Sequence, residues 1–276
     1  MASTKSLARA LRPAALALAI AASLGLTACD IQVREGGKFK VGIFSAQATQ
    51  EWTHTYSLKA GGHIEIANLN GPIELAQGPV GSSLDVRADI TAKALTDAGA
   101  KEILSKGKIE ETVTPERVKV ETVVPRGVHG SYEVRYQVRL PPGIEAQVST
   151  ANGSVKAVGL TSKLKASIVN GAVEMTDMAG ALDAAVVNGS LTVKLASVSA
   201  PVRLETTNGR LLLELPQTSK ANLSARVVNG GLTVSGLPVE EPDQRRIKNI
   251  EAALNGGGPS IDLRTTNGRV TITGTP

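Results

Sequence analysis

The chain has 276 residues, enough for one large domain or two smaller ones. It contains 30 basic and 25 acidic residues, but Lys5, Arg9 and Arg12 precede an N-terminal apolar run, which leaves 27 basic against 25 acidic residues from residue 29 onward. That balance gives no support to nucleic-acid binding. The lack of aromatic residues after Tyr136 argues against a sugar-binding groove in the C-terminal half, because such grooves usually stack sugar rings on aromatic faces.

Residues 1–28 have the pattern of a signal peptide. An apolar run from Ala14 to Leu26 follows the basic residues and is too short to cross a bilayer as a helix. It leads into Leu26-Thr27-Ala28-Cys29, which resembles the bacterial lipobox. The resemblance implies cleavage before Cys29 and lipidation of that residue; the alternative is a secreted protein with an incidental cysteine. Because Cys29 is the only cysteine, its lipidation would exclude disulfides, thiol catalysis and cysteine metal ligation.

The lipobox predicts a membrane partner and a location. A lipoprotein anchor carries several acyl chains, and two or more chains hold a protein stably to a membrane. Asp30 follows the cysteine and resembles an inner-membrane retention signal. We therefore expect a cell-envelope lipoprotein that faces the periplasm, with the inner membrane favoured over the outer membrane.

Residues 29–49 are expected to be an anchor and linker, and residues 50–142 an N-terminal β subregion. This subregion contains alternating apolar and polar segments typical of strands, at 52–58, 63–69, 72–76, 83–94, 117–125 and 132–143. One short helix is predicted over 96–106, with Thr96 or Asp97 at its N-cap and Gly107 at its end. Pro141-Pro142-Gly143 marks a soft boundary to the region that follows.

Residues 143–276 are dominated by a repeat built around Asn-Gly. The first intervals between the asparagines are 18, 18, 20 and 21 residues, and the last is 38. That last interval contains a further Asn255-Gly256. The repeated pairs are Asn152-Gly153, Asn170-Gly171, Asn188-Gly189, Asn208-Gly209, Asn229-Gly230 and Asn267-Gly268, with an outlying copy at Asn70-Gly71.

Two geometries fit these units. The last inward residue before Asn-Gly and the first after it are always five positions apart, as with Ile168 and Val173. Asparagine and glycine both tolerate positive φ, so the pair could form a two-residue hairpin turn. It could equally form the corner of a β-solenoid, in which equivalent asparagines of successive coils stack as a hydrogen-bonded ladder. We favour the solenoid, a rod roughly 30 Å long, because a hairpin meander gives no reason for the asparagines to align. Its handedness stays open.

The segment 240–254 interrupts the repeats. Its mixed charge predicts a helical turn or an irregular coil, solvated on the side of the stack. As the longest insertion, it is also a place where a partner could bind.

The ordered series resembles a bacterial adhesin-type family of domains of unknown function with a β-solenoid fold. The resemblance covers roughly residues 50–276, and the insertion at 240–254 fits it least well. It implies an all-β fold but no catalytic residues. The segments that carry it are 63–75, 132–143, 148–158 and 255–274.

Few residues suggest chemistry. His54, His63 and His129 have no partner at metal-ligand spacing, and no nucleophile or phosphate-loop motif is present. A polysaccharide-cleaving β-helix enzyme would need clustered acids, whereas the aspartates of the repeats lie in different units (Asp177, Asp183 and Asp262). Arginines recur near the turns, as a mild basic stripe or as ordinary solubility charge (Arg203, Arg210, Arg226, Arg264 and Arg269). We expect no catalytic residues, no metal and no cofactor.

The sequence thus favours a non-catalytic, membrane-anchored module of the cell envelope, either adhesin-like or structural. Its partner would be an envelope protein, a glycan or a second copy of the chain. An envelope-stress or signalling accessory protein is the alternative, and a polysaccharide-active enzyme is the least favoured hypothesis.

Overall fold

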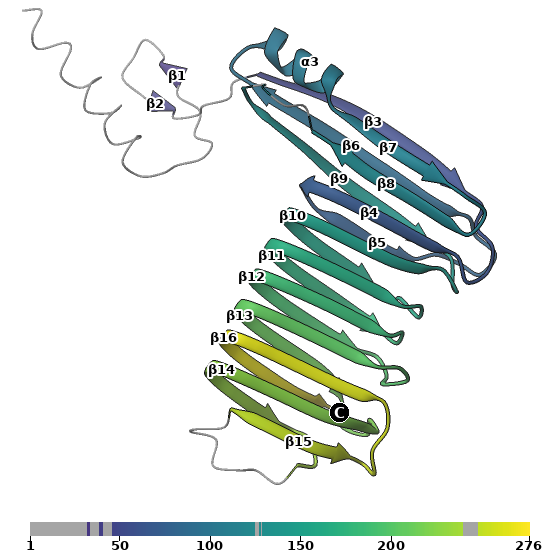
Figure 1. Cartoon of the computed structure of the whole chain (residues 1–276), viewed down its shortest axis with the longest axis vertical. Helices are drawn as coiled ribbons and strands as arrows, with labels where there is room; N and C mark the ends of the chain where they lie inside the picture. The colour runs from purple at the N-terminus through teal and green to yellow at the C-terminus, as the bar shows by residue number, and fades with distance from the viewer. Residues whose placement is uncertain (1–31, 34–38, 41–45, 125–126, 128, 240–247) are drawn as a thin grey trace, which may run out of the picture.

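The computed structural model describes residues 32–33, 39–40, 46–124, 127, 129–239 and 248–276 (Figure 1). Residues 1–28, Cys29, Asp30 and residues 240–247 of the insertion lie outside the described residues. No helix within the described part of the chain is long and apolar enough to span a membrane. Two short strands near the N-terminus, β1 (Gln32–Val33) and β2 (Phe39–Lys40), pair with each other.

The repeats form a stack of long parallel strands, each bent at its Asn-Gly pair. Neighbouring strands align asparagine with asparagine and glycine with glycine, as in Asn170 beside Asn188. This parallel register confirms the solenoid and excludes the hairpin meander. The strands are β10 (Glu145–Val158), β11 (Leu164–Met178), β12 (Leu182–Leu195), β13 (Val202–Pro216), β14 (Ala221–Ser235) and β16 (Ser260–Thr275).

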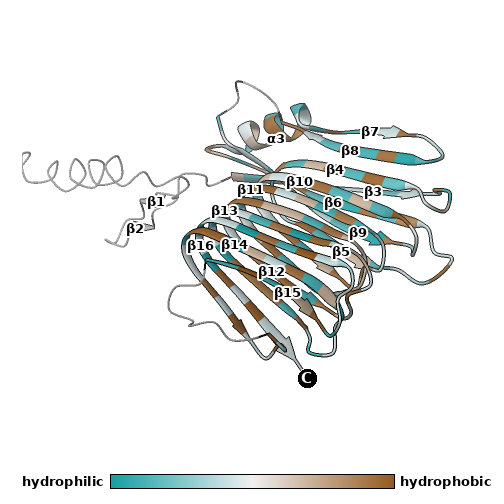
Figure 2. Cartoon of the chain, turned by 60° about the horizontal axis from the view of Figure 1, so that its bottom comes forward, coloured by the Kyte–Doolittle hydropathy of each residue, from teal (hydrophilic) through white to brown (hydrophobic). Residues whose placement is uncertain are grey.

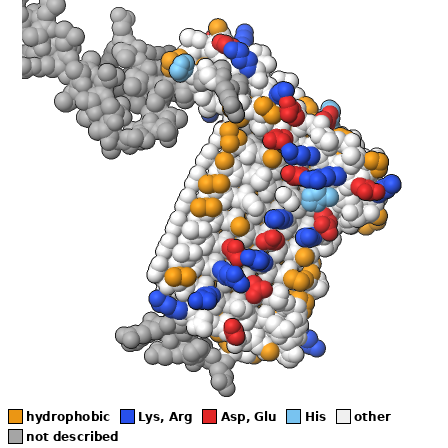
Figure 3. Space-filling view, viewed as in Figure 1, with side chains coloured by type: hydrophobic (Ala, Val, Ile, Leu, Met, Phe, Trp, Pro, Cys, Tyr) orange, Lys and Arg blue, Asp and Glu red, His pale blue; other side chains and the backbone are white. Residues whose placement is uncertain are grey.

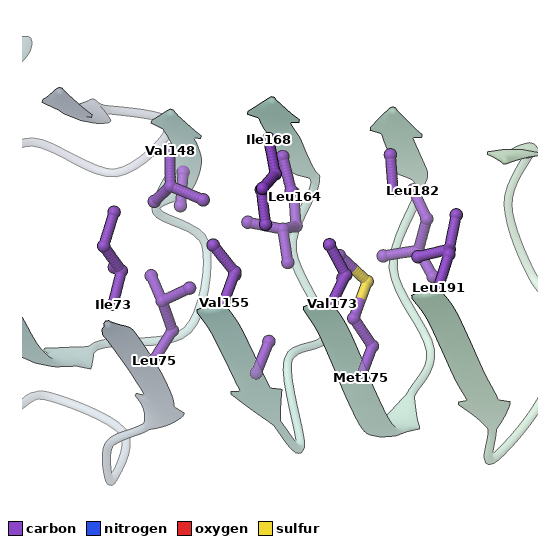
Figure 4. Packing of buried hydrophobic residues seen from close by; sticks show 14 of the residues in the cluster. Ile73, Leu75, Val148, Val155, Leu164, Ile168, Val173, Met175, Leu182 and Leu191 are labelled. Carbon is purple, nitrogen blue, oxygen red and sulfur yellow. The ribbon is translucent and has the colours of Figure 1, made fainter. Parts of the chain in front are cut away.

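Each bent strand has a first arm before Asn-Gly and a second arm after it. The first arms form one layer and the second arms the other, and the side chains between them form the core. In β11, Leu164 and Ile168 of the first arm and Val173 of the second are buried. Figure 4 shows these side chains pointing toward one another from the two layers. The alternating colours along each strand in Figure 2 reflect the same period-two pattern.

The bend at each Asn-Gly, which we call the corner, leaves no room for a side chain on the glycine. The corner glycines of β11 to β14 and β16 have φ between 145° and 155°, whereas their asparagines avoid positive φ. A Cβ atom on Gly189 would lie 1.7 Å from the carbonyl oxygen of Gly171, and the other four corners are equally tight. Each bent strand is one rung of the stack. Glycine is therefore required at the corner by its positive φ and by the close approach of the backbone of the neighbouring rung.

The rungs do not stack in sequence order at the C-terminal end. β16 lies between β13 and β14, so Asn267 stands between Asn208 and Asn229. Our expectation that successive coils stack on one another is wrong for these last units. The buried hydroxyls of Thr206 and Thr265 lie 2.9 Å apart and hydrogen-bond to each other. The equivalent residue of β14 is Val227, which would leave Thr206 without this partner in a sequential stack.

The described part of the insertion is a strand, which corrects the expected helical turn or coil. β15 (Asn249–Leu254) pairs antiparallel with the first arm of β14 and covers that edge. The following Asn255-Gly256 is not a corner of the stack. Asn255 has φ 50°, and its side chain donates to the carbonyls of Gln217 and Ser219.

The N-terminal subregion continues the two layers. The outlying Asn70-Gly71 is the corner of the first rung, because it joins β4 (His63–Asn70) to β5 (Ile73–Gln77), which pair with the two arms of β10. The first layer continues through β8 (Arg117–Val123) and β7 (Lys108–Val113). The second layer continues through β9 (Ser131–Leu140), β6 (Leu84–Ala94) and β3 (Ala46–Tyr56).

The short helix in this subregion is confirmed. It is α3 (Asp97–Lys106), and the Thr96 hydroxyl caps it by accepting a hydrogen bond from the Gly99 amide at 3.1 Å. The buried side chains of the helix, Ala100 and Ile103, face the β3 and β6 end of the stack.

We predict that Gly189→Ala lowers the free energy of unfolding by at least about 3 kcal/mol, because the added Cβ meets a backbone carbonyl at positive φ. Urea unfolding followed by circular dichroism measures the loss. Gly231→Ala is the matched control, since no atom lies within 4 Å of its added Cβ. Equal stability of both variants would contradict the proposed packing of the corner.

Candidate binding surface along the corner

The corner asparagines form one continuous hydrogen-bonded ladder. Each Nδ2 donates to the Oδ1 of the asparagine on the next rung, and the chain of bonds runs in one direction from Asn229 to Asn70. The distances are between 2.8 and 3.0 Å. The side chains of Asn170, Asn188 and Asn208 are exposed, so the ladder lies on the surface. One N–H of each amide stays available outside the ladder.

An apolar row runs beside the ladder. It consists of the residues that precede each asparagine, which occupy equivalent places because the rungs are in register. Leu69, Val169, Val187 and Val228 are between 41% and 51% exposed, unusually high for large aliphatic side chains. Ala151, Thr207 and Thr266 hold the same place on the other rungs. Figure 3 shows hydrophobic side chains in a line near one margin of the stack, beside a band free of charged side chains.

A trough runs along the other side of the ladder, because the corner glycines have no side chains to fill it. One hollow of about 780 Å³ lies over Gly71, Gly153 and Gly171. A second, of about 830 Å³, lies over the glycines of the later rungs and is lined by Ser190, Arg210 and Arg269. The corner thus carries an apolar row, an amide ladder and a trough in parallel along the stack.

The expected arginine stripe is divided between two faces. Arg210 and Arg269 follow the corner glycines and stand in the trough, whereas Arg203, Arg226 and Arg264 lie on the outer face of the first layer. There Arg203 donates to Glu205 at 2.8 Å, which raises the pKa of Arg203, and Asp183 and Asp262 on neighbouring strands add to the effect. The five residues therefore do not make one continuous basic stripe.

The three aspartates singled out in the repeats lie apart from one another or beside cations. Asp183 and Asp262 stand on either side of Arg203 in register, which makes them members of an alternating charge row. Asp177 lies at the end of the second arm of β11 with φ 56°. Within the described residues, no group of three or more His, Cys, Asp or Glu side chains could hold a metal ion.

One polar cluster was missed by sequence reasoning. Glu111 of β7 reaches across the N-terminal end of the stack, where its Oε2 lies 2.9 Å from Nδ1 of His54 and accepts a 2.5 Å hydrogen bond from the Tyr56 hydroxyl. The ring of Trp52 stacks on His54 at 4.5 Å. Burial, and then the bond to Glu111, raises the pKa of Tyr56, so the phenol stays protonated.

This cluster joins the two layers, because Glu111 lies on β7 of the first layer and His54 and Tyr56 lie on β3 of the second. From the sequence, period-two alternation predicts only that His54 and Tyr56 share one face of their strand. Nothing in the sequence points to Glu111, which is 57 residues from His54. The other histidines lie elsewhere. His63 begins β4, where partial burial and then Arg117 lower its pKa, and His129 is exposed before β9.

We predict that Asn188→Ala lowers the free energy of unfolding by about 1–2 kcal/mol, because it removes one bond given to Asn170 and one received from Asn208. Asn229→Ala is the control at the end of the ladder, where only the bond to Asn267 is lost. Thermal unfolding of the two variants compares these losses. A larger loss for Asn229→Ala would mean that the ladder contributes little to stability.

Comparisons with known proteins agree with this architecture. Residues 27–273 match the model of the family described as Toastrack DUF4097, a domain of unknown function. No curated protein matches the chain in sequence.

Three solved structures are similar over most of the chain. A "putative cell adhesion protein" from Clostridium sporogenes is 14% identical, with a TM-score of 0.47, over 83% of this chain and 100% of that one. A "putative adhesin" from Bacteroides fragilis is 13% identical, with a TM-score of 0.35, over 82% and 97%. A "putative lipid binding protein" from Parabacteroides distasonis is 10% identical, with a TM-score of 0.27, over 84% and 98%. The family match alone spans nearly the whole sequence, and the chain therefore belongs to the Toastrack DUF4097 family.

Proposed function

We propose that the protein is a non-catalytic, adhesin-like interaction module of the cell envelope. Lipidated Cys29 holds the chain to a membrane, and the corner of the solenoid contacts a partner in the periplasmic space. The observation that carries this proposal is the in-register row of exposed aliphatic side chains beside the asparagine ladder. Leu69, Ala151, Val169 and Val187 occupy consecutive strands of the stack, and a contiguous exposed apolar patch of this kind is typical of a contact surface.

The rigidity of the corner supports this role. The glycine contacts and the ladder fix the spacing of the apolar row at one strand separation, about 4.8 Å. A surface that is ordered before binding loses little conformational entropy when a partner docks on it. The corner is therefore suited to recognition of an extended partner, and its residues offer no nucleophile paired with a base.

The anchoring part of the proposal rests on the signal peptide and lipobox pattern, Leu26-Thr27-Ala28-Cys29. Asp30 favours retention at the inner membrane, with the solenoid on the periplasmic side. Residues 30–45 then separate the lipid from β3, where the stack begins.

We predict that Cys29→Ser moves the protein from the membrane fraction to the soluble fraction, because the thiol that accepts the acyl chains is gone. Cell fractionation and immunoblotting measure the change. Asp30→Ser keeps Cys29 and should stay with membranes. Continued membrane fractionation of Cys29→Ser would refute the lipid anchor.

The contact surface is tested by Val187→Glu, which places a charge in the middle of the apolar row. We expect the immobilised variant to retain several-fold less native envelope material than the wild-type protein, because burying the carboxylate at an interface is unfavourable. Val80→Glu is the control, since Val80 is 90% exposed in a loop away from the corner. Equal retention by both variants would show that the row is not the contact surface.

A further inference from the structure

We propose that Arg210 and Arg269 form a binding site for the anionic groups of an acidic glycan lying in the trough. The proposal rests on the proposed function, because it names the chemistry of the partner that the corner contacts. The two residues are register partners on the adjacent strands β13 and β16, and both are exposed. Their backbones are therefore one strand separation apart, about 4.8 Å.

The charge of this pair is not compensated within the described part of the chain. Ser190 and Gly231 are their outer neighbours in the same row, and neither guanidinium has an ion pair with a described acidic side chain. Like charges at directly opposite positions on adjacent strands are destabilising. Among the described residues, the pair has no local counter-charge at the corner.

On the outer face of the same strands, Arg203 and Arg264 each have an acidic neighbour. Arg264 is also the register partner of Arg226 on β14, but it lies 4.0 Å from Glu205. One row of the first layer there alternates in sign, from Lys165 to Asp183, Arg203 and Asp262. On the second layer, Lys194 pairs with Glu214 at 3.0 Å. In-register stacking thus places an acid beside a cation at these positions. The pair at the corner has no such neighbour among the described residues, and we infer that a ligand supplies its counter-ion.

The surroundings of the pair fit an oxyanion on a linear polymer. Recognition is through its charge, because this half of the chain has no aromatic residues on which sugar rings could stack. The trough floor is glycine backbone, and Ser190 adds a hydroxyl to the lining beside the two guanidiniums. Two guanidiniums supply planar sets of donors that match carboxylate, sulfate or phosphate oxygens. The corner glycines continue in register toward Gly71, where the first hollow lies, so an extended chain can follow the stack over several rungs.

The position of the pair favours a glycan over the headgroups of the anchoring membrane. The order of strands places β13 and β16 near one end of the stack and β3 at the other. The proposed anchor at Cys29 precedes β3 in the chain, and the arginine pair lies toward the opposite end of the stack from β3.

The test uses the full chain, purified from membranes in detergent, and polygalacturonate as the acidic glycan. Isothermal titration should detect binding that weakens as the ionic strength rises, while neutral dextran gives none. The double variant R210S/R269S should weaken binding roughly tenfold or more. Serine already follows Asn-Gly at Ser154 and Ser190, so the substitution suits the fold, and thermal unfolding verifies this.

The matched control is K165S/R203S, which removes two positive charges from the outer face of the same stack. It should bind polygalacturonate within about twofold of the wild-type protein. Equal weakening by both double variants would mean that net charge drives binding, and would overturn the site. Binding to anionic phospholipid vesicles that depends on Arg210 and Arg269, without binding to polygalacturonate, would overturn the glycan assignment.

The outcome separates this site from the proposed function. If Val187→Glu loses envelope binding while R210S/R269S binds polygalacturonate like the wild type, the corner remains a contact surface and only the anion site is refuted. If Val187→Glu keeps envelope binding, the contact surface itself is refuted, whatever the glycan result.

Discussion

The close approach of successive corner glycines is the constraint on which the rest of the structure depends. Each of these glycines packs against the carbonyl of the glycine on the neighbouring rung, with no room for a side chain. A shift by one residue would bring a Cβ into that contact and turn the core side chains outward. The corner therefore fixes the register of every rung, and the register places equivalent residues in straight rows on both layers and along the corner.

Because the rows are straight, a residue type that is repeated at one position of the rungs forms a continuous feature along the stack. Asparagine repeated at one position becomes a ladder in which every amide is oriented alike, and hydrogen bonds in such chains reinforce one another. Valine repeated one position earlier becomes an exposed apolar row. Alternating signs become a compensated charge row, whereas two arginines in succession concentrate positive charge. The surface chemistry of this protein is thus set by which residues occupy one place in consecutive rungs.

A stack of this kind must also end, and its ends are closed in different ways. At the C-terminal end, β15 covers the first arm of β14 with antiparallel pairing. At the N-terminal end, α3 packs beside β3 and β6, and Glu111 joins the layers through His54 and Tyr56. Covered edges offer fewer free backbone groups for unwanted strand pairing. The corner remains exposed between these two covered ends.

The sequence by itself determined the repeat unit, the inward and outward faces of each strand and the helix capped by Thr96. These features depend on local periodicity and local hydrogen bonds, as the five-residue separation of Ile168 and Val173 illustrates. Only the tertiary structure decided which strands are neighbours. Alternation says which side of a strand is buried, but not what lies beside it. The place of β16 between β13 and β14, where Thr265 meets Thr206, was therefore not visible in the sequence. The contact of Glu111 with His54 also joins residues far apart in the sequence. The same is true of the pairing of Arg210 with Arg269. Neither could be predicted from local periodicity.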